Sequence, residues 1–407
     1  MEKFVEKPIE SPSLMSRYVA YLFAIACGLF VANIYYAQPL LDAISSEFGI
    51  THSSVGIIIT ITQVCYALGL LLLVPLGDFV NRRRLIAGQM LISVLALIVV
   101  STARTSTILF IGIAAVGLLA VVTQALVAFA ATLAASADRG RVVGMVTSGI
   151  VVGILLARAF AGVLTDLAGW RSVYLVSAVL TLIMAGALIR VLPHDEQERE
   201  RKSLSYLQLL RSVFMLFVQE RILRIRAVLA LLIFTAFSIL WTSLVLPLSA
   251  PPISLSHTAI GAFGLAGVTG ALAAARAGRL ADRGLGQKTT GVALVLLLVS
   301  WLPISYTEHS LLALIVGIIL LDLAVQAVHV TNQSMIFTVR PESRSRLTAG
   351  YMIFYSIGSA IGSIASTRIY HFLGWNGVCL LGASVSALAL LFWSLTRSTG
   401  RYINPIK

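Results

Sequence analysis

Residues 136–176 read SADRGRVVGMVTSGIVVGILLARAFAGVLTDLAGWRSVYLV, and residues 341–381 read PESRSRLTAGYMIFYSIGSAIGSIASTRIYHFLGWNGVCLL. The two segments align without a gap at an offset of 205 positions. The alignment pairs Arg139 with Arg344, Arg141 with Arg346, Gly153 with Gly358, and Gly169-Trp170 with Gly374-Trp375. A repeat of this length predicts two similar halves, each built from the same order of elements.

The composition around this repeat is that of a chain dissolved in lipid. Of the 407 residues, 58% are hydrophobic and only 12% are charged, whereas a soluble domain carries about 25% charged residues. The net charge of +13 does not indicate nucleic-acid binding, because the basic residues form short clusters between apolar runs, as in membrane proteins.

Twelve apolar runs are long enough to cross a hydrocarbon core about 30 Å thick. They lie near residues 18–41, 54–76, 85–102, 107–134, 142–165, 172–192, 227–249, 258–277, 289–306, 311–338, 347–369 and 375–396. The even number places both termini on the same side. Of the 30 Lys and Arg residues, only Arg104, Arg158, Arg171 and Arg368 lie outside one set of connections. Because basic loops remain cytoplasmic, we expect a multi-pass protein of the inner (cytoplasmic) membrane with both termini in the cytoplasm.

The expected fold is all-α: twelve transmembrane helices in two pseudo-symmetric six-helix bundles. We divide the chain into an N-terminal bundle (1–193), a cytoplasmic linker (194–226) and a C-terminal bundle (227–407). The linker begins with the charge run PHDEQERERK and continues with SYLQLLRSVFMLFVQERILRIR. The second segment alternates apolar residues and arginines at helical spacing, which predicts a helix lying in the membrane interface.

Three motifs give the sequence its resemblance to the major facilitator superfamily. LGDFVNRRR follows the second span, with Asp78, Arg82 and Arg83 at the positions of the family's cytoplasmic loop motif, and GRLADRGLGQK follows the eighth, with Asp282 and Arg283 in register. In the fifth span, Gly144, Gly153, Ala157, Arg158, Ala161 and Gly162 follow the spacing of a motif found in antiporter members. NIYYAQPLLD in the first span resembles the twelve-helix branch of drug, sugar and nucleoside exporters.

The resemblance implies that the loop motifs act as a gate. Asp78 is expected to reach the N-terminus of the eleventh span near Arg344, and Asp282 that of the fifth span near Arg139, because helix N-termini attract carboxylates. Such contacts would close the cytoplasmic side. The alternative is that these charges only set orientation. The small residues around Gly153 and Gly162 predict close helix packing and a surface on which the halves pivot.

Asp322 is the acidic residue that lies deepest in an expected span. It sits about 16 Å into the tenth span, where a charge costs at least about 2.5–3.5 kcal/mol. Gln326, His329 and Gln333 follow at spacings of 4, 3 and 4 and share its helical face, so the stripe should face a cavity or a polar helix. We expect Asp322 to carry the coupling proton, with His329 beside it. A structural Asp322 paired with Arg or His is the alternative.

Arg158 is the second charge expected inside the membrane, in the outer third of the fifth span. It could reach the interface, pair with Asp42, or hold an anionic group of a substrate. Family antiporters often carry an arginine in the fourth span. Residues 107–134 contain none, although Gln124 is present, so we expect Arg158 to take part in coupling.

Aromatic residues with polar tips are the expected contacts of a semi-polar organic solute. The candidate substrate-binding residues are Asn33, Tyr36, Gln63, Tyr66, Gln124, Trp241, Gln326, Gln333, Tyr351 and Tyr355. The alternative for each tyrosine is a core or interfacial position.

The sequence thus predicts proton-driven export of a small organic solute by a monomer, with the lipid bilayer as its solvent and protons as the coupling ion. A proton-coupled uptake symporter and a non-transporting membrane sensor remain alternatives. We expect no enzymatic activity, no metal and no cofactor, because no metal cluster, nucleophile–base pair or nucleotide-binding glycine loop stands out.

Overall fold

The computed structural model describes residues 16–78, 80–134, 138–192, 206–267, 276–340 and 344–397. Within these ranges the regular structure is entirely helical. Ten of the described helices are long and apolar enough to cross a membrane. Since a backbone in lipid must satisfy its own hydrogen bonds, helices are the structure that such apolar runs adopt.

The described residues of the first half form eight α-helices. They are α1 (Arg17–Tyr35), α2 (Leu41–Phe48), α3 (Ile57–Leu72), α4 (Arg82–Ser101), α5 (Ser106–Leu119), α6 (Val122–Leu133), α7 (Arg139–Ala168) and α8 (Trp170–Val191), with 3₁₀ turns η1 (Gln38–Leu40) and η2 (Pro75–Asp78). The first span therefore continues through η1 into α2, and the fourth is divided between α5 and α6.

The second half follows the linker. Its helices are α9 (Tyr206–Gln219), α10 (Arg221–Ser243), α11 (Val245–Ser249), α12 (His257–Ala262), η4 (Phe263–Gly267), η5 (Ala281–Leu285), α14 (Gly286–Val299), α15 (Trp301–Ser305), α16 (Leu311–Phe337) and α17 (Arg344–Thr396). The helix α10 begins six residues before the expected 227. The linker limits at 194 and 226 stay a prediction.

The count of ten and the expected twelve are compatible for two reasons. The helix α17 covers both expected spans 347–369 and 375–396, and its backbone leaves the helical region at Gly374 (φ 61°, ψ −158°). Part of the expected span 258–277 lies outside the described residues, between η4 and residue 276. The fold is the all-helical membrane architecture expected from the sequence.

The sequence repeat is also a repeat of structure. Gly169 separates α7 from α8 with φ 77°, and its counterpart Gly374 breaks α17 with φ 61°. Both values are in the left-handed region that glycine tolerates best. A Cβ at Gly153 would lie 2.2 Å from the carbonyl oxygen of Gly28 on α1, and one at Gly358 would lie 2.1 Å from that of Leu231 on α10. Equivalent glycines thus permit equivalent helix contacts in the two halves.

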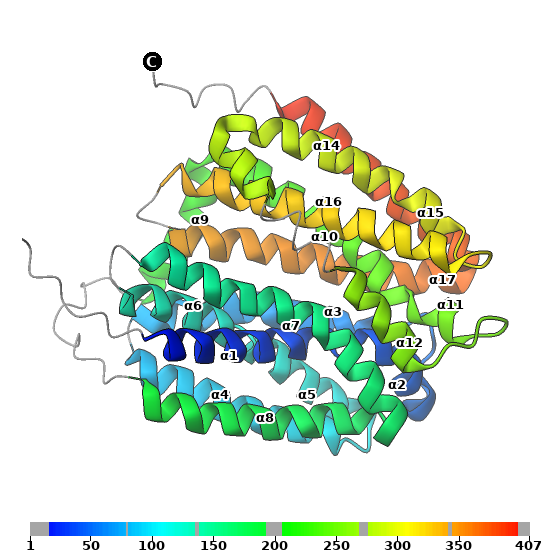
Figure 1. The fold of residues 1–407 in the computed structure, drawn as a ribbon, viewed down its shortest axis with the longest axis horizontal. Helices are drawn as coiled ribbons and strands as arrows, with labels where there is room; N and C mark the ends of the chain where they lie inside the picture. The colour runs from blue at the N-terminus through cyan, green and yellow to red at the C-terminus, as the bar shows by residue number, and fades with distance from the viewer. Residues whose placement is uncertain are drawn as a thin grey trace, which may run out of the picture.

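Figure 1 shows the helices of the first half packed together and α14, α16 and α17 gathered above them. The helices α1 and α10 begin at one end of the molecule, which we call the proximal end. The helices α2, α11 and α12 lie at the opposite end, which we call the distal end (Figure 1). By the distribution of basic residues, the proximal end is the one expected to face the cytoplasm.

Candidate functional site

The centre of the candidate site lies where the two halves meet, around the indole ring of Trp241 on α10. The guanidinium of Arg158, from α7, lies over the face of this ring, with 3.8 Å between its carbon and the ring centroid. The indole N–H donates to Oδ1 of Asp322, from α16, over 3.1 Å. One side chain therefore contacts both Arg158 and Asp322, and these two charges belong to different halves.

Both charged groups are almost fully buried, with 2% of Arg158 and 5% of Asp322 exposed. Burial of a charge is costly unless polar partners replace water. Nε of Arg158 donates to Oε1 of Gln38 over 2.9 Å, whereas its Nη2 has no hydrogen-bond partner among the described residues. A buried donor without a partner can bind an acceptor oxygen that reaches this point.

Aromatic rings surround the Arg158 guanidinium. The ring centroids of Tyr35 and Phe237 lie 5.2 Å and 5.6 Å from its carbon. The hydroxyl groups of Tyr35 and Tyr355 form a hydrogen bond that connects α1 with α17, and thus one half with the other. Rings of this kind bind the faces of sugars, bases and drugs and hold a cation through their π electrons.

A glycine, Gly267, leaves space beside the carboxylate of Asp322. A Cβ at Gly267, at the end of η4, would lie 2.7 Å from Oδ2 of Asp322. Any side chain there would have to displace the carboxylate, so the backbone of η4 approaches Asp322 closely only because residue 267 is glycine.

Part of the polar stripe of α16 packs against other helices of the protein, because Asp322 and His329 both contact neighbouring side chains. Beyond Asp322, Nδ1 of His329 lies 3.0 Å from the hydroxyl of Tyr351 on α17, and the His329 ring packs edge-on against Phe234 of α10. Gln326 and Gln333 are half-buried. Thus Asp322 and His329 both lie against α10 or α17, and Tyr351 lies within the second half and not at the seam.

The other candidate substrate contacts separate into two groups. Asn33 accepts a hydrogen bond of 2.7 Å from Ser177 on α8, and Tyr36 packs against Phe160 and Tyr174. Both residues therefore lie inside the first half. Whether they bind a solute stays a prediction.

The second group lies on α3 and α6. The amide of Gln124 lies 3.5 Å from the hydroxyl of Tyr66, and Tyr66 is buried. Gln63 is buried, and its Oε1 has no hydrogen-bond partner within the described residues. These three side chains belong to helices of the first half, and whether they bind a solute stays a prediction.

Tyr35, Gln38 and Phe237 were missed as site residues in the sequence. Tyr35 and Gln38 belong to the quoted motif NIYYAQPLLD, and Gln38 lies five positions after Asn33. The motif itself was the signal, but Asn33 and Tyr36 share a helical face and were chosen together, and helical spacing does not tell which face lies toward the seam. Phe237 carried no signal, since one phenylalanine in an apolar span is ordinary.

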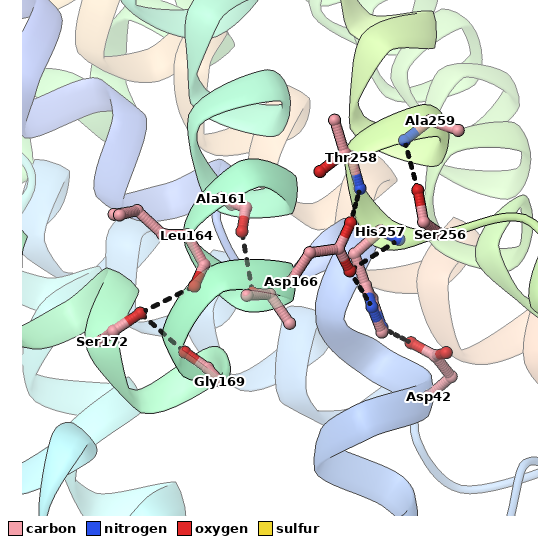
Figure 2. A network of polar contacts seen from close by, with 11 residues as sticks. Asp42, Ala161, Leu164, Asp166, Gly169, Ser172, Ser256, His257, Thr258 and Ala259 are labelled. Carbon is pink, nitrogen blue, oxygen red and sulfur yellow. Dashed lines mark hydrogen bonds and ion pairs between the residues drawn. The ribbon is translucent and has the colours of Figure 1, made fainter.

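A second polar network connects the halves at the distal end (Figure 2). His257, the first residue of α12, lies between two carboxylates of the first half: its Nε2 is 3.2 Å from Asp42 and its Nδ1 is 3.1 Å from Asp166. Asp166 also accepts from the backbone N–H of Thr258 over 2.7 Å. Both ring nitrogens face oxygens that only accept, so the doubly protonated imidazolium fits this site. The hydrogen bond to Asp42, followed by the charges of both carboxylates, raises the pKa of His257 above its usual 6.5.

This network corrects one interpretation that the sequence left open. Arg158 does not pair with Asp42, because Asp42 contacts His257 and Arg158 contacts Gln38. Arg158 also does not reach the interface, since it is buried between the halves.

Small residues allow the distal ends of the halves to touch. A Cβ at Gly162 of α7 would lie 2.1 Å from the carbonyl oxygen of His257, and one at Gly261 of α12 would lie 2.3 Å from that of Arg158. On the other side of the seam, the hydroxyl of Thr60 donates to the carbonyl of Ala360 over 3.0 Å. The two halves are therefore in backbone contact at the distal end.

The expected cytoplasmic gate is only partly described. The side chains of Asp78, Asp282, Arg139 and Arg344 lie outside the described residues, so their contacts stay a prediction. Nε of Arg82 donates to the carbonyl of Gly77 over 3.2 Å, and Arg83 donates to that of Ile189 over 2.6 Å. These two arginines thus contact the first half, and Arg283 is exposed.

Comparison with known proteins places the chain among transporters. The sequence model of the Major Facilitator Superfamily matches residues 22–291 and 227–405. The chain is 49% identical over 372 residues to the "Uncharacterized transporter YgaY" of Escherichia coli O157:H7, covering 91% of this chain and 94% of that protein. It is 22% identical over 380 residues to a "Probable sugar efflux transporter" of Helicobacter pylori, covering 92% and 93%. The crystal structure of a bacterial homologue of the human lysosomal transporter Spinster, inward-facing and occupied, superposes with a TM-score of 0.75 at 14% identity, covering 94% of this chain and 97% of that one.

Proposed function

The chain belongs to the major facilitator superfamily, and from this premise we propose that it exports a small organic solute in exchange for protons by alternating access. It is a multi-pass membrane transporter and not an enzyme. In alternating access, the seam between the halves opens to one side of the membrane at a time. The proposal concerns three properties of the transporter: the class of its solute, the direction of transport and the coupling ion.

One observation carries the proposal: Trp241 contacts two buried, opposite charges that come from different halves. Asp322 can exist with or without a proton, whereas Arg158 keeps its charge in either case. Protonation of Asp322 would leave the cation of Arg158 without its counter-charge. The balance between the orientations of the halves would then change, because a ligand shifts an equilibrium by its differential interaction with the two states.

The solute would bind Arg158 as a further partner beside Gln38. Nη2 of Arg158 is a buried donor without a partner among the described residues, and the ring centroids of Tyr35 and Trp241 lie 5.2 Å and 3.8 Å from its guanidinium carbon. A solute with an acceptor oxygen and a flat or apolar face, such as a sugar, a nucleoside or an amphipathic drug, would satisfy both features. A proton on Asp322 and a solute on Arg158 would thus favour different orientations.

Two observations support export over uptake. The spacing from Gly144 to Gly162 resembles the antiporter motif, and a relative of similar length is named for sugar efflux. A proton-coupled uptake symporter uses the same fold and is the alternative that the experiment must separate. A non-transporting sensor is the second alternative.

The test is flux in vesicles that contain the purified protein. An acidic interior drives an antiporter to accumulate solute, whereas an acidic exterior drives a symporter, whichever way the protein is inserted. We expect uptake of at least one sugar, nucleoside or drug into vesicles that are acidic inside. Asp322→Asn should bind that solute but lose gradient-driven uptake by about a hundredfold, the low end of the effect of removing a group that transfers protons.

Asp138→Asn is the matched control, because Asp138 is an exposed carboxylate just before α7. It should transport at the wild-type rate. Equal flux through wild type and Asp322→Asn would refute the coupling role. Accumulation only with an acidic exterior would establish the symporter, and no flux of any solute under either gradient would favour the sensor.

A further inference from the structure

The aromatic rings around Arg158 form an arrangement that proteins use to bind cationic ligands. The guanidinium carbon lies 3.8 Å, 5.2 Å and 5.6 Å from the ring centroids of Trp241, Tyr35 and Phe237, which we call the aromatic cage. Rings placed in this way attract a positive charge through their π electrons, and such cages are typical sites for quaternary ammonium groups. Here a side chain of the protein itself supplies the cation.

Asp322 supplies the other component of a cation site, a carboxylate. Its Oδ1 accepts a hydrogen bond from the indole N–H of Trp241, whose ring face contacts the guanidinium. Ionised Asp322 and Arg158 together have no net charge, because Arg158 already provides the positive charge that the carboxylate and the rings attract. A cationic solute would therefore have to compete with a cation that belongs to the chain.

The Arg158 side chain is held in the aromatic cage by contacts on two sides. Its Nε donates to Gln38 over 2.9 Å. Its aliphatic stem passes close to the backbone of η4, since a Cβ at Gly264 would lie 3.0 Å from Cβ and 3.3 Å from Cδ of Arg158. A side chain that is confined in this way is preorganised, so we expect the guanidinium to remain in the cage when a solute binds.

Arg158 offers a solute a hydrogen-bond donor and a positive charge. Its Nη2 is buried and has no partner among the described residues, and a guanidinium has no acceptor atom. Two positive unit charges about 5 Å apart, at an effective dielectric constant of about 20, repel each other enough to weaken binding roughly a hundredfold. We propose that Arg158 determines specificity by excluding cations, so that the transporter selects flat solutes with an acceptor oxygen and no positive charge. This assignment rests on the proposed function, because it takes the seam between the halves as the solute site.

The test compares two flat amides of the same shape that differ in charge: the cation 1-methylnicotinamide and its neutral carbon isostere 3-methylbenzamide. Titration calorimetry with the purified full-length protein in micelles measures both dissociation constants. Wild type should bind 3-methylbenzamide about a hundredfold tighter than the cation, and Arg158→Lys should keep that preference because the charge remains. Arg158→Gln should bind the cation about tenfold tighter than the neutral amide, the effect of a desolvated cation–π contact.

Arg171→Gln is the matched control, because Arg171 also lies over an indole ring, 4.5 Å from the centroid of Trp170, but at the distal end, where it pairs with Glu47 of α2. It should bind both amides as wild type does. Equal binding of the two amides to wild type would overturn the proposal. An unchanged preference in folded Arg158→Gln would overturn it too, as would the absence of binding of either amide to every variant.

Flux is a separate measurement that distinguishes this proposal from the proposed function. The expected order of binding, without flux of any solute, would refute transport and leave the specificity intact. Gradient-driven flux of 1-methylnicotinamide through wild type would refute the specificity and leave transport intact.

Discussion

Gly162 offers the sharpest test of how the halves meet, because a single methyl group there would act as a wedge. A Cβ at residue 162 would lie 2.1 Å from the carbonyl oxygen of His257 and 3.1 Å from the amide nitrogen of Thr258. Ordinary contacts of this kind begin at 3.4 Å. The helices α7 and α12 must therefore separate by roughly 1 Å in Gly162→Ala, and both sides of the contact are backbone, so no change of rotamer relieves it.

The free-energy cost belongs only to the state in which the distal end is closed. Overpacking of a tight contact costs about 1–3 kcal/mol, which corresponds to a change of about 5–150-fold in an equilibrium constant. The gain in helix propensity from glycine to alanine, up to about 1 kcal/mol, applies to both orientations and cancels from their ratio. We expect the fraction of molecules that are open at the distal end to rise by about 5–150-fold.

Cysteine labelling at residue 367 measures this fraction. The hydroxyl of Thr367 lies fully buried, 3.4 Å from the carbonyl of Ser53 across the seam, so a Thr367→Cys thiol reacts with maleimide only when the distal end opens. With the native cysteines replaced by serine, Gly162→Ala should react 5–150 times faster than its parent. Gly144→Ala, on the same helix with no atom within 4 Å of its Cβ, should react at the parent rate. Equal rates in the two variants, both folded, would refute the wedge.

Three further predictions concern the seam, the first half and the candidate site. The closed distal end should weaken as pH rises, because the pKa of His257 is raised: the stabilisation is complete below the usual 6.5 and is lost as pH passes the raised value. The rate of labelling at residue 367 should therefore increase with pH, by no more than about tenfold because His257 is partly exposed. In His257→Gln the labelling rate should not depend on pH. A wild-type labelling rate that does not depend on pH would contradict the role of His257. Gly153→Ala places a Cβ 2.2 Å from the carbonyl of Gly28 inside the first half. The substitution should lower the free energy of unfolding by about 1–3 kcal/mol and lower the melting temperature. An unchanged melting temperature would show that α1 and α7 separate freely. Trp241→Phe removes the indole N–H that donates to Asp322 and should lower gradient-driven flux about tenfold, the effect of one hydrogen bond to a charged group. Size-exclusion chromatography should show a folded protein, and full flux would assign Trp241 a packing role.

Much of the fold could be predicted because the lipid bilayer constrains the length, hydropathy and flanking charges of each span, and all three can be read along the sequence. Span length follows from the bilayer thickness, and the expected cytoplasmic side follows from the positions of arginines. The repeat located Gly153 and Gly358 as equivalent contacts, which the structure confirms in the matching approaches to α1 and α10. Asp322 and Arg158 could be selected as candidates because a charge within a span is costly enough to need a reason.

The partners of those charges could not be predicted in this way. Helical spacing tells which residues share a face, but it does not tell which face of another helix lies opposite. Arg158 and Trp241 are far apart in the chain, and so are His257 and Asp42. The turn η1 brings Gln38 beside Arg158, whereas periodicity from Asn33 pointed into the first half.

Hydropathy, charge and self-similarity thus sufficed for the membrane setting, the all-helical class and the two-fold plan, since these depend on local composition alone. The pairing of α7 with α12, the stacking of Arg158 on Trp241 and the placement of His257 between two carboxylates required the packed molecule. Each of these contacts joins segments from different halves, and only the packing of complete helices against one another sets such distances.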